Sequence, residues 1–118
     1  MRELHRFENN YIEMNGVFYW DLPYLYNQLK QGLLAFRNAN VGKLDCIGID
    51  TWGVDYGLLD KNGQLLSNPR SYRYALDEDM AEAWKTVDFP TLFARTGIAT
   101  MNFNTVYQLY RRKRQGDP

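Results

Sequence analysis

Cysteine and histidine, two common catalytic and metal-binding residues, are scarce in this chain of 118 residues, which contains one of each. A single cysteine, Cys46, excludes an internal disulfide, and no cysteine or histidine pair shows metal-ligand spacing. The apolar neighbours of Cys46 favour a buried thiol over a nucleophile. His5 has no second histidine, cysteine or hydroxyl group at useful spacing, so we expect a half-buried strand residue rather than a catalytic group.

Long apolar runs and an excess of one charge are also lacking. No stretch approaches the roughly 18 apolar residues of a membrane span, and the first ten residues lack the apolar core of a signal peptide. We therefore expect a cytoplasmic protein. Lysine plus arginine and aspartate plus glutamate balance at 14 each, which favours neither nucleic acid nor a membrane as partner.

Phosphate-binding and metal-binding motifs are not evident either. The nine glycines are scattered and form no P-loop or dinucleotide loop. The only basic run, residues 111–114, is predicted to be a solvated helix C-terminus, with a nucleic-acid patch as the alternative. Asp77, Glu78 and Asp79 could ligate a metal, but neighbouring helix positions diverge around the axis, which favours an acidic helix start.

The sequence contains clear local signals for strands, turns and helices. Asn15-Gly16 between two apolar segments predicts a hairpin, and Asp21 with Pro23 predicts a helix start. The remaining elements are predicted from apolar periodicity and caps: strands over 3–10 and 45–50, a second hairpin turn at 60–63, and helices over 77–87, 88–97 and 104–115. This order predicts one domain with a mixed α/β layer.

The end of the predicted strand over 45–50 has an unusual composition, because the strand stops at Asp50, and Trp52, Gly53 and Asp55 follow closely. Ligand crevices form at the carboxyl ends of strands in open α/β sheets. Gly53 lets a backbone N–H approach a polar ligand, and Trp52 offers a sugar an apolar platform. The alternative is that Trp52 fills the core and the carboxylates cap local turns. The residues alone leave both readings open.

Aromatic residues are abundant: nine tyrosines, six phenylalanines and three tryptophans. A well-filled core of a small domain is the favoured interpretation, and a carbohydrate-binding face is the alternative.

Four segments resemble, in the same order, elements of the rhamnulokinase family of FGGY carbohydrate kinases. They are "HRFENN" (5–10), "NGVFYWDL" (15–22), "IGIDTWGVDYGLLDKNGQLLSNPRSYR" (47–73) and "RTGIATMNFNTVYQLY" (95–110). The resemblance implies an α/β, ribonuclease H-like mixed sheet with flanking helices, as in actin, hexokinase and Hsp70. The sheet would be incomplete here because the first strands of the family fold are missing.

The resemblance also implies a sugar site. The glycine of "TWG" contacts the ketose through its backbone in the family, which corresponds to Gly53. Trp52, Asp55 and Arg73 lie in the same motif and are therefore expected to line the sugar site. The chain departs from the family at Tyr74, where many members have an aspartate after Tyr-Arg.

The activity implied for the parent protein is ATP-dependent phosphorylation of the 1-hydroxyl of L-rhamnulose or a related ketose, with ATP and Mg²⁺ as cofactors. We find no counterpart of the family's phosphate-binding hairpin, catalytic aspartate or nucleotide domain. Residues 1–118 are thus expected to be a partial N-terminal sugar-binding domain, with no catalytic, cofactor or metal residue and no activity alone. The unpaired edge of the strand over 3–10 predicts self-association.

Two other functions remain as alternatives. A stand-alone carbohydrate-binding module would use Trp52, Gly53 and the tyrosine-rich surface. A nuclease of ribonuclease H type would use Asp50, Asp55 and the acidic cluster at 77–79. The nuclease chemistry requires carboxylates that converge on two metal ions about 3.5–4 Å apart.

Overall fold

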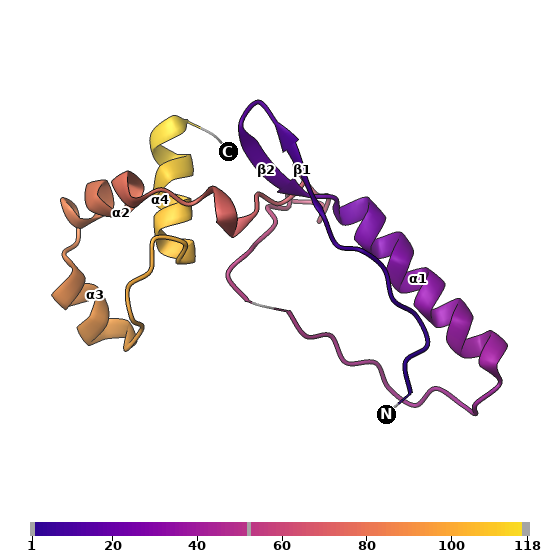
Figure 1. Ribbon diagram of the computed structural model, residues 1–118. Coiled ribbons are helices and arrows are strands. Elements are labelled where there is room, and N and C mark those ends of the chain that lie inside the picture. Colours follow the sequence, from indigo (N-terminus) through magenta and orange to yellow (C-terminus); the bar gives the residue numbers. More distant parts are fainter. Residues whose placement is uncertain (1, 52, 117–118) are drawn as a thin grey trace. The chain divides into compact units, whose positions relative to one another are not determined.

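The computed structural model describes residues 2–51 and 53–116. The chain forms two compact units: residues 1–52 with 57–69, and residues 53–56 with 70–118. Each unit is described separately. The first contains strands β1 (Tyr11–Met14) and β2 (Val17–Trp20) and helix α1 (Leu22–Ala39). The second contains a 3₁₀ turn (Tyr72–Tyr74) and helices α2 (Asp77–Trp84), α3 (Phe89–Thr96) and α4 (Thr105–Gln115) (Figure 1).

The hairpin of the first unit confirms the prediction made from Asn15-Gly16. β1 and β2 are antiparallel, with Tyr11 opposite Trp20 and Met14 opposite Val17. Asn15 and Gly16 have φ angles of 52° and 75°, the left-handed pair that a tight hairpin turn requires. β2 ends at Trp20, which is buried.

Helix α1 also begins where the sequence predicts. The Asp21 carboxylate accepts a hydrogen bond from the Tyr24 N–H at 3.0 Å, and Pro23 lies in the first turn. Asn40 ends the helix in the left-handed conformation and donates its N–H to the Arg37 carbonyl. Both ends are therefore satisfied by local groups, as helix ends require.

The strand predicted over residues 3–10 is wrong. The segment forms no strand and pairs with no described strand. It contacts α1 instead: His5 shares a 2.8 Å hydrogen bond with Gln28, and the Tyr24 hydroxyl donates to the Glu8 carbonyl at 3.3 Å. His5 is exposed rather than half-buried. Alternation alone could not specify a strand here, because a strand needs a hydrogen-bonding neighbour.

The buried strand predicted over residues 45–50 is also wrong. The segment has no strand conformation, and Ile47 and Ile49 are 57% and 76% exposed. Cys46 is exposed too, which corrects the expectation of a buried thiol. An apolar strand is buried only when other segments cover its faces and pair with its edges. No described segment does so here.

The second predicted hairpin turn is present in reduced form. The Asp60 carboxylate accepts the N–H groups of Asn62 and Gln64, each at 2.8 Å. Gly63 adopts φ = +79°. Among the described residues, the arms pair through one bridge, between Leu59 and Leu65.

The second unit is helical, and its helices confirm the sequence predictions. Asp88 caps α3 by accepting the Thr91 N–H at 2.8 Å, and Gly97 ends it with φ = +67°. α2 begins with the acidic triplet at 77–79, and α4 follows Asn104 as cap. α2 packs against α4.

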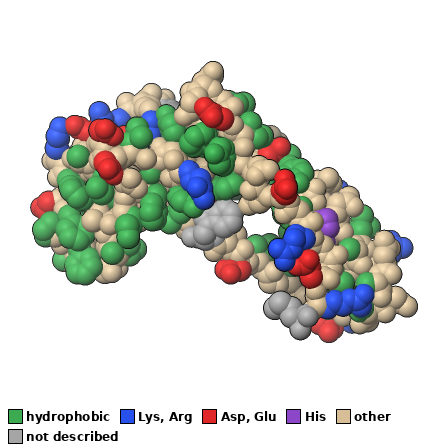
Figure 2. All heavy atoms as spheres, viewed as in Figure 1, with side chains coloured by type: hydrophobic (Ala, Val, Ile, Leu, Met, Phe, Trp, Pro, Cys, Tyr) green, Lys and Arg blue, Asp and Glu red, His purple; other side chains and the backbone are tan. Residues whose placement is uncertain are grey.

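Aromatic side chains form the small core of the second unit. Tyr107 is 2% exposed, and its hydroxyl accepts the indole N–H of Trp84 at 3.0 Å. Apolar side chains also gather on the surface over α3, where Phe93 and Ile98 are exposed (Figure 2).

The described residues of the two units are mixed α/β. Their sheet has two strands, and the ribonuclease H-like sheet stays a prediction.

Candidate sugar-contact loop and its supports

The second unit joins two segments that are about fifty residues apart in sequence. Thr105 Oγ1 donates to the Val54 carbonyl oxygen at 3.1 Å, and Gln108 Nε2 donates to the same oxygen at 3.2 Å. Gln108 also donates to the Phe103 carbonyl at 2.7 Å. The first turn of α4 therefore fixes the main chain next to Gly53. A carbonyl with two lone pairs accepts both donors.

Gly53 is exposed and has φ = +81°. Among the described residues beyond its chain neighbours, no atom lies within 4 Å of the position that a Cβ would occupy. Glycine is required here by the backbone angle rather than by crowding, because L residues rarely adopt positive φ. The predicted site residue Trp52, its neighbour, lies outside the described residues.

Asp55 is half-buried, and its Oδ1 accepts the backbone N–H of Tyr72 at 2.7 Å. Its carboxylate thus caps the 3₁₀ turn over Tyr72–Tyr74, as one of the two readings of the sequence expected. Ser71, which is 1% exposed, accepts the Arg73 N–H at the start of that turn. Asp50 is exposed and belongs to the first unit.

Arg73 lies on the exposed side of the same turn, with its guanidinium 5.7 Å from the centre of the Tyr72 ring. The Tyr72 ring meets the Phe103 ring edge-on at 5.7 Å. Three of the four predicted site residues, Gly53, Asp55 and Arg73, are therefore in one unit. Asp55 caps the turn that contains Arg73, and Gly53 is two residues before Asp55.

A mainly apolar groove of about 310 Å³ begins at Gly53 and Val54. Its other walls are side chains of α3, including Phe89 and Leu92, and the start of α4 at Asn104. Ligand pockets in proteins commonly begin at about 300 Å³. The groove is therefore large enough to hold part of a small molecule beside the Gly53 backbone.

The basic run at 111–114 is divided between the interior and the surface, which corrects the prediction of a solvated helix end. The side chain of Arg111 is 12% exposed and Arg112 is 8% exposed, whereas Lys113 and Arg114 are exposed. The split arises because residues three and four apart share one side of a helix. A run of four consecutive residues therefore points partly to the inner face of α4 and partly to solvent. The run is thus not a continuous nucleic-acid patch.

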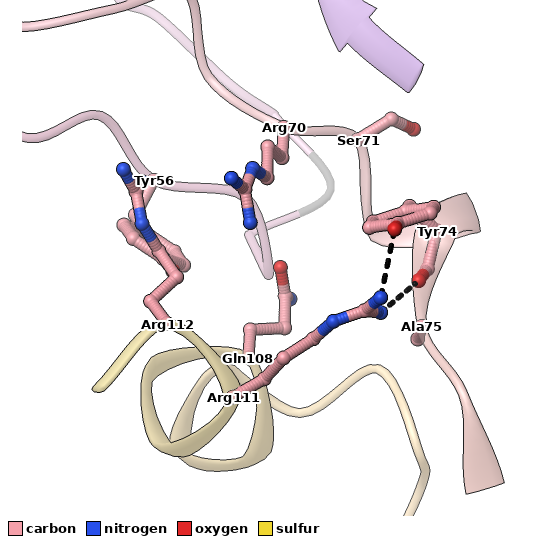
Figure 3. A pocket seen from close by; sticks show the side chains of 8 residues that line it. All are labelled: Tyr56, Arg70, Ser71, Tyr74, Ala75, Gln108, Arg111 and Arg112. Carbon is pink, nitrogen blue, oxygen red and sulfur yellow. Dashed lines mark hydrogen bonds between the residues drawn. The ribbon is translucent and has the colours of Figure 1, made fainter. Parts of the chain in front are cut away.

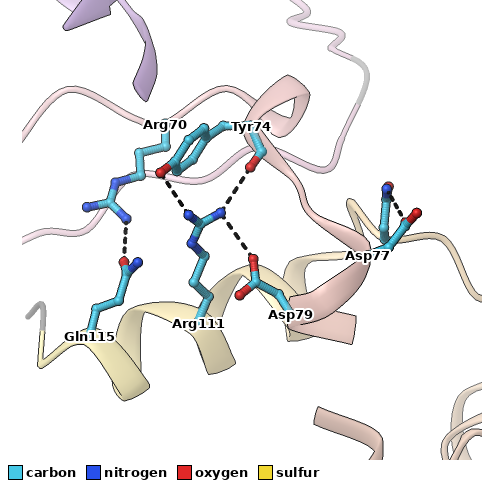
Figure 4. Close-up of polar contacts among 7 residues, drawn as sticks. Arg70, Tyr74, Asp77, Asp79, Arg111 and Gln115 are labelled. Carbon is cyan, nitrogen blue, oxygen red and sulfur yellow. Dashed lines mark hydrogen bonds and ion pairs between the residues drawn. The ribbon is translucent and has the colours of Figure 1, made fainter. Parts of the chain in front are cut away.

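Arg111 makes the densest set of polar contacts in this region (Figure 4). Its guanidinium donates to the Tyr74 carbonyl at 3.1 Å and to the Tyr74 hydroxyl at 2.7 Å. It also pairs with the Asp79 carboxylate at 3.0 Å and lies 4.1 Å above the centre of the Tyr74 ring. Tyr74, where the sequence departs from the resembled motif, is therefore held by Arg111.

A small cavity of about 20 Å³ lies beside this contact (Figure 3). Arg70, Ser71, Tyr74 and Arg111 are among its lining residues. The volume suits one water molecule, so this cavity is too small for a sugar. Arg70 also donates to Gln115, at the end of α4, at 3.3 Å (Figure 4).

Sequence reasoning missed three residues of this arrangement: Thr105, Gln108 and Arg111. Their spacing of three residues on α4 was the available signal, since it puts them on neighbouring parts of one helix face. The expectation of a solvated helix end concealed Arg111, because a run of charges suggests solvent exposure before periodicity is considered.

The described residues contain no group of three acidic, histidine or cysteine side chains that could hold a metal ion. Asp77 accepts a hydrogen bond from Asn102 at 2.8 Å, and Asp79 pairs with Arg111. These contacts give no support to a two-metal nuclease centre. The part of the chain that the structure covers has no helix long and apolar enough to cross a bilayer.

Comparison with known proteins relates the chain to carbohydrate kinases. Specifically, it is similar to curated rhamnulokinases along nearly its whole length. That of Halalkalibacterium halodurans is 42% identical over 116 residues, which cover 98% of this chain and 25% of the relative. Those of Mannheimia succiniciproducens and Bacteroides thetaiotaomicron are 41% and 40% identical, covering 92% and 99% of this chain and 23% and 24% of the relatives.

The resemblance noted in the sequence is thereby confirmed: the chain is a relative of rhamnulokinases over the part that it matches. It spans about a quarter of the length of these proteins. No model of a protein family matches the chain.

Proposed function

We propose that residues 1–118 are part of the N-terminal sugar-binding domain of an ATP-dependent kinase. The proposed reaction of the whole protein is phosphorylation of the 1-hydroxyl of L-rhamnulose or a close relative. The similarity to curated rhamnulokinases supports this class of activity. A stand-alone carbohydrate-binding module is disfavoured because the named relatives are kinases.

One structural observation carries the sugar-binding part of the proposal. Gly53 is exposed at positive φ, and the next carbonyl, that of Val54, is held by Thr105 and Gln108. A fixed main chain without a Cβ suits recognition of a sugar hydroxyl, since binding then requires little further ordering. In this proposal Arg73 and Trp52 line the sugar site, while Asp55 holds the loop.

ATP and Mg²⁺ belong to the proposed reaction of the whole protein. The described residues do not fit these groups, because they include no cluster that could hold a metal ion and the scattered glycines form no phosphate loop. Phosphoryl transfer depends on positioning and on neutralising the developing charge. This stretch is therefore proposed to bind and orient the sugar only, and a coupled ADP-release assay of the chain with L-rhamnulose is expected to show no turnover.

Binding is tested by adding L-rhamnulose, L-fuculose or xylulose to the ¹⁵N-labelled chain and following its amide resonances. We expect the Gly53 amide to shift on addition of the preferred ketose. Gly53→Ala should abolish the shift elsewhere in the loop. Gly63→Ala is the matched control, because Gly63 has φ = +79° and equally open space, so both variants carry similar strain, about 1–2 kcal/mol. No shift with any of the ketoses would contradict the proposed binding.

A further inference from the structure

The side chain of Arg111 is 12% exposed, and Arg111 is not among the residues that line the groove that begins at Gly53. We propose that Arg111 is a positioning residue for the Gly53 loop, acting through Tyr74 and Asp55. This inference rests on the proposed sugar-binding role of that loop. It adds a residue that determines how the loop is held rather than one that contacts the sugar.

The first step of the argument is the grip of Arg111 on Tyr74. The guanidinium contacts the carbonyl, the hydroxyl and the ring face of this one residue. The Asp79 carboxylate, 15% exposed, fixes the guanidinium from α2. A planar group with five donors can satisfy these partners together, whereas the point charge of a lysine cannot.

The second step connects Tyr74 to the loop. The Tyr74 N–H donates to the Ser71 carbonyl at 3.0 Å, which closes the 3₁₀ turn. The Tyr72 N–H of the same turn donates to Asp55. Displacement of Tyr74 therefore moves the donor on which the Asp55 carboxylate depends, two residues after Gly53.

The third step is that the loop has a second, independent support. The Val54 carbonyl is held from α4 by Thr105 and Gln108, and α4 also carries Arg111. One face of α4 thus holds the Gly53 loop directly at Val54 and indirectly through the turn at Tyr72–Tyr74. Loss of Arg111 should leave the direct support and release the indirect one.

Three variants test the proposal: Arg111→Lys, Arg111→Met and the double variant Arg111→Met with Asp79→Leu. The double variant removes the half-buried carboxylate that the single change leaves without its cation, a standard cause of instability. Lys113→Met is the matched control, because Lys113 is exposed in the same basic run. The probe is L-rhamnulose, with amide resonances, sugar affinity and thermal unfolding measured for each protein.

We expect the double variant to regain folding stability while sugar binding stays about tenfold weaker, a factor equivalent to roughly one lost hydrogen bond. The amides of Gly53, Asp55 and Tyr72 should shift in the sugar-free variants and stay in place in Lys113→Met. Normal affinity with unmoved loop amides in the double variant would overturn the proposal. If the unchanged chain bound no sugar, the proposed function would be refuted. The role of Arg111 would then be judged from the loop amides alone, and unmoved amides in the double variant would overturn it.

Discussion

The Asp55 carboxylate lies 2.7 Å from the backbone nitrogen of Tyr72, seventeen positions later in the chain. This hydrogen bond is charge-assisted, and such bonds are stronger than those between neutral groups. It fixes the Tyr72–Tyr74 turn next to the residue pair Gly53-Val54. The carboxylate that first suggested a ligand or a metal is therefore occupied with main chain of its own protein.

Replacing Asp55 with alanine should leave the half-buried Tyr72 N–H without this acceptor. Unsatisfied groups of this kind cost about 1–3 kcal/mol. Asp55→Asn keeps an oxygen and should cost less. Hydrogen exchange of the Tyr72 amide measures the effect directly. Asp60→Ala, which removes a similar turn acceptor in the other unit, should not alter that amide, and unchanged Tyr72 protection in Asp55→Ala would contradict the assignment.

Two side chains share the Val54 carbonyl, so their removal should be non-additive. Gln108→Ala or Thr105→Val alone leaves one donor on Val54. Thr105→Val should cost about 1 kcal/mol of unfolding free energy, and Gln108→Ala more, because it also loses the bond to the Phe103 carbonyl. The double variant leaves the carbonyl with neither donor and should cost more than the sum of the single changes. Urea unfolding of the four proteins measures this. Lys113→Ala on the exposed side of α4 is the control, and simple additivity would refute shared support of Val54.

The sequence allowed the local elements to be predicted and left the interior of each unit open. Asn15-Gly16 and the caps Asp21 and Asp88 act through neighbours within a few residues, so their effects could be inferred from spacing alone. The strands expected at 3–10 and 45–50 depend on partners far along the chain, which no local pattern specifies.

The candidate site shows the same division between local and non-local information. Gly53 was predicted from its lack of a side chain and from the resemblance, both of which are properties of its own motif. The support from Thr105, Gln108 and Arg111 comes from a helix about fifty residues later. Only the fold reveals that two of these side chains end on Val54 and the third on Tyr74.

Helix α3 should lose stability in acid through its cap. The N–H of Thr91, the main cause, holds the pKa of the Asp88 carboxyl below its ordinary value of 3.8. Because the folded pKa is the lower one, this carboxylate stabilises the fold fully above the unfolded pKa. The contribution is lost as the pH falls through the folded pKa. We expect the Thr91 amide resonance to move in that acid range.

Asp88→Asn provides the control for this titration. Asparagine caps a helix about as well as aspartate but does not ionise, so α3 should persist in the variant without the acid transition at Thr91. The amide of Leu109 on α4 serves as an internal reference, since it lies in another helix. An identical acid transition of Thr91 in Asp88→Asn would show that another group is responsible.

The exposed segment at 45–50 predicts self-association more directly than the segment at 3–10, which lies against α1. Ile47 and Ile49 face solvent in a β-prone stretch that lies outside any described strand and that no described residue pairs with. Unpaired backbone N–H and C=O groups in an apolar stretch of this kind pair readily with another chain. We expect sedimentation to show oligomers that increase with concentration, and Ile49→Lys to shift the chain towards monomer. Leu66→Lys, at another exposed apolar position of the same unit, should have little effect. A stable monomer at high concentration, or an equal effect of the two lysines, would exclude this segment as the contact.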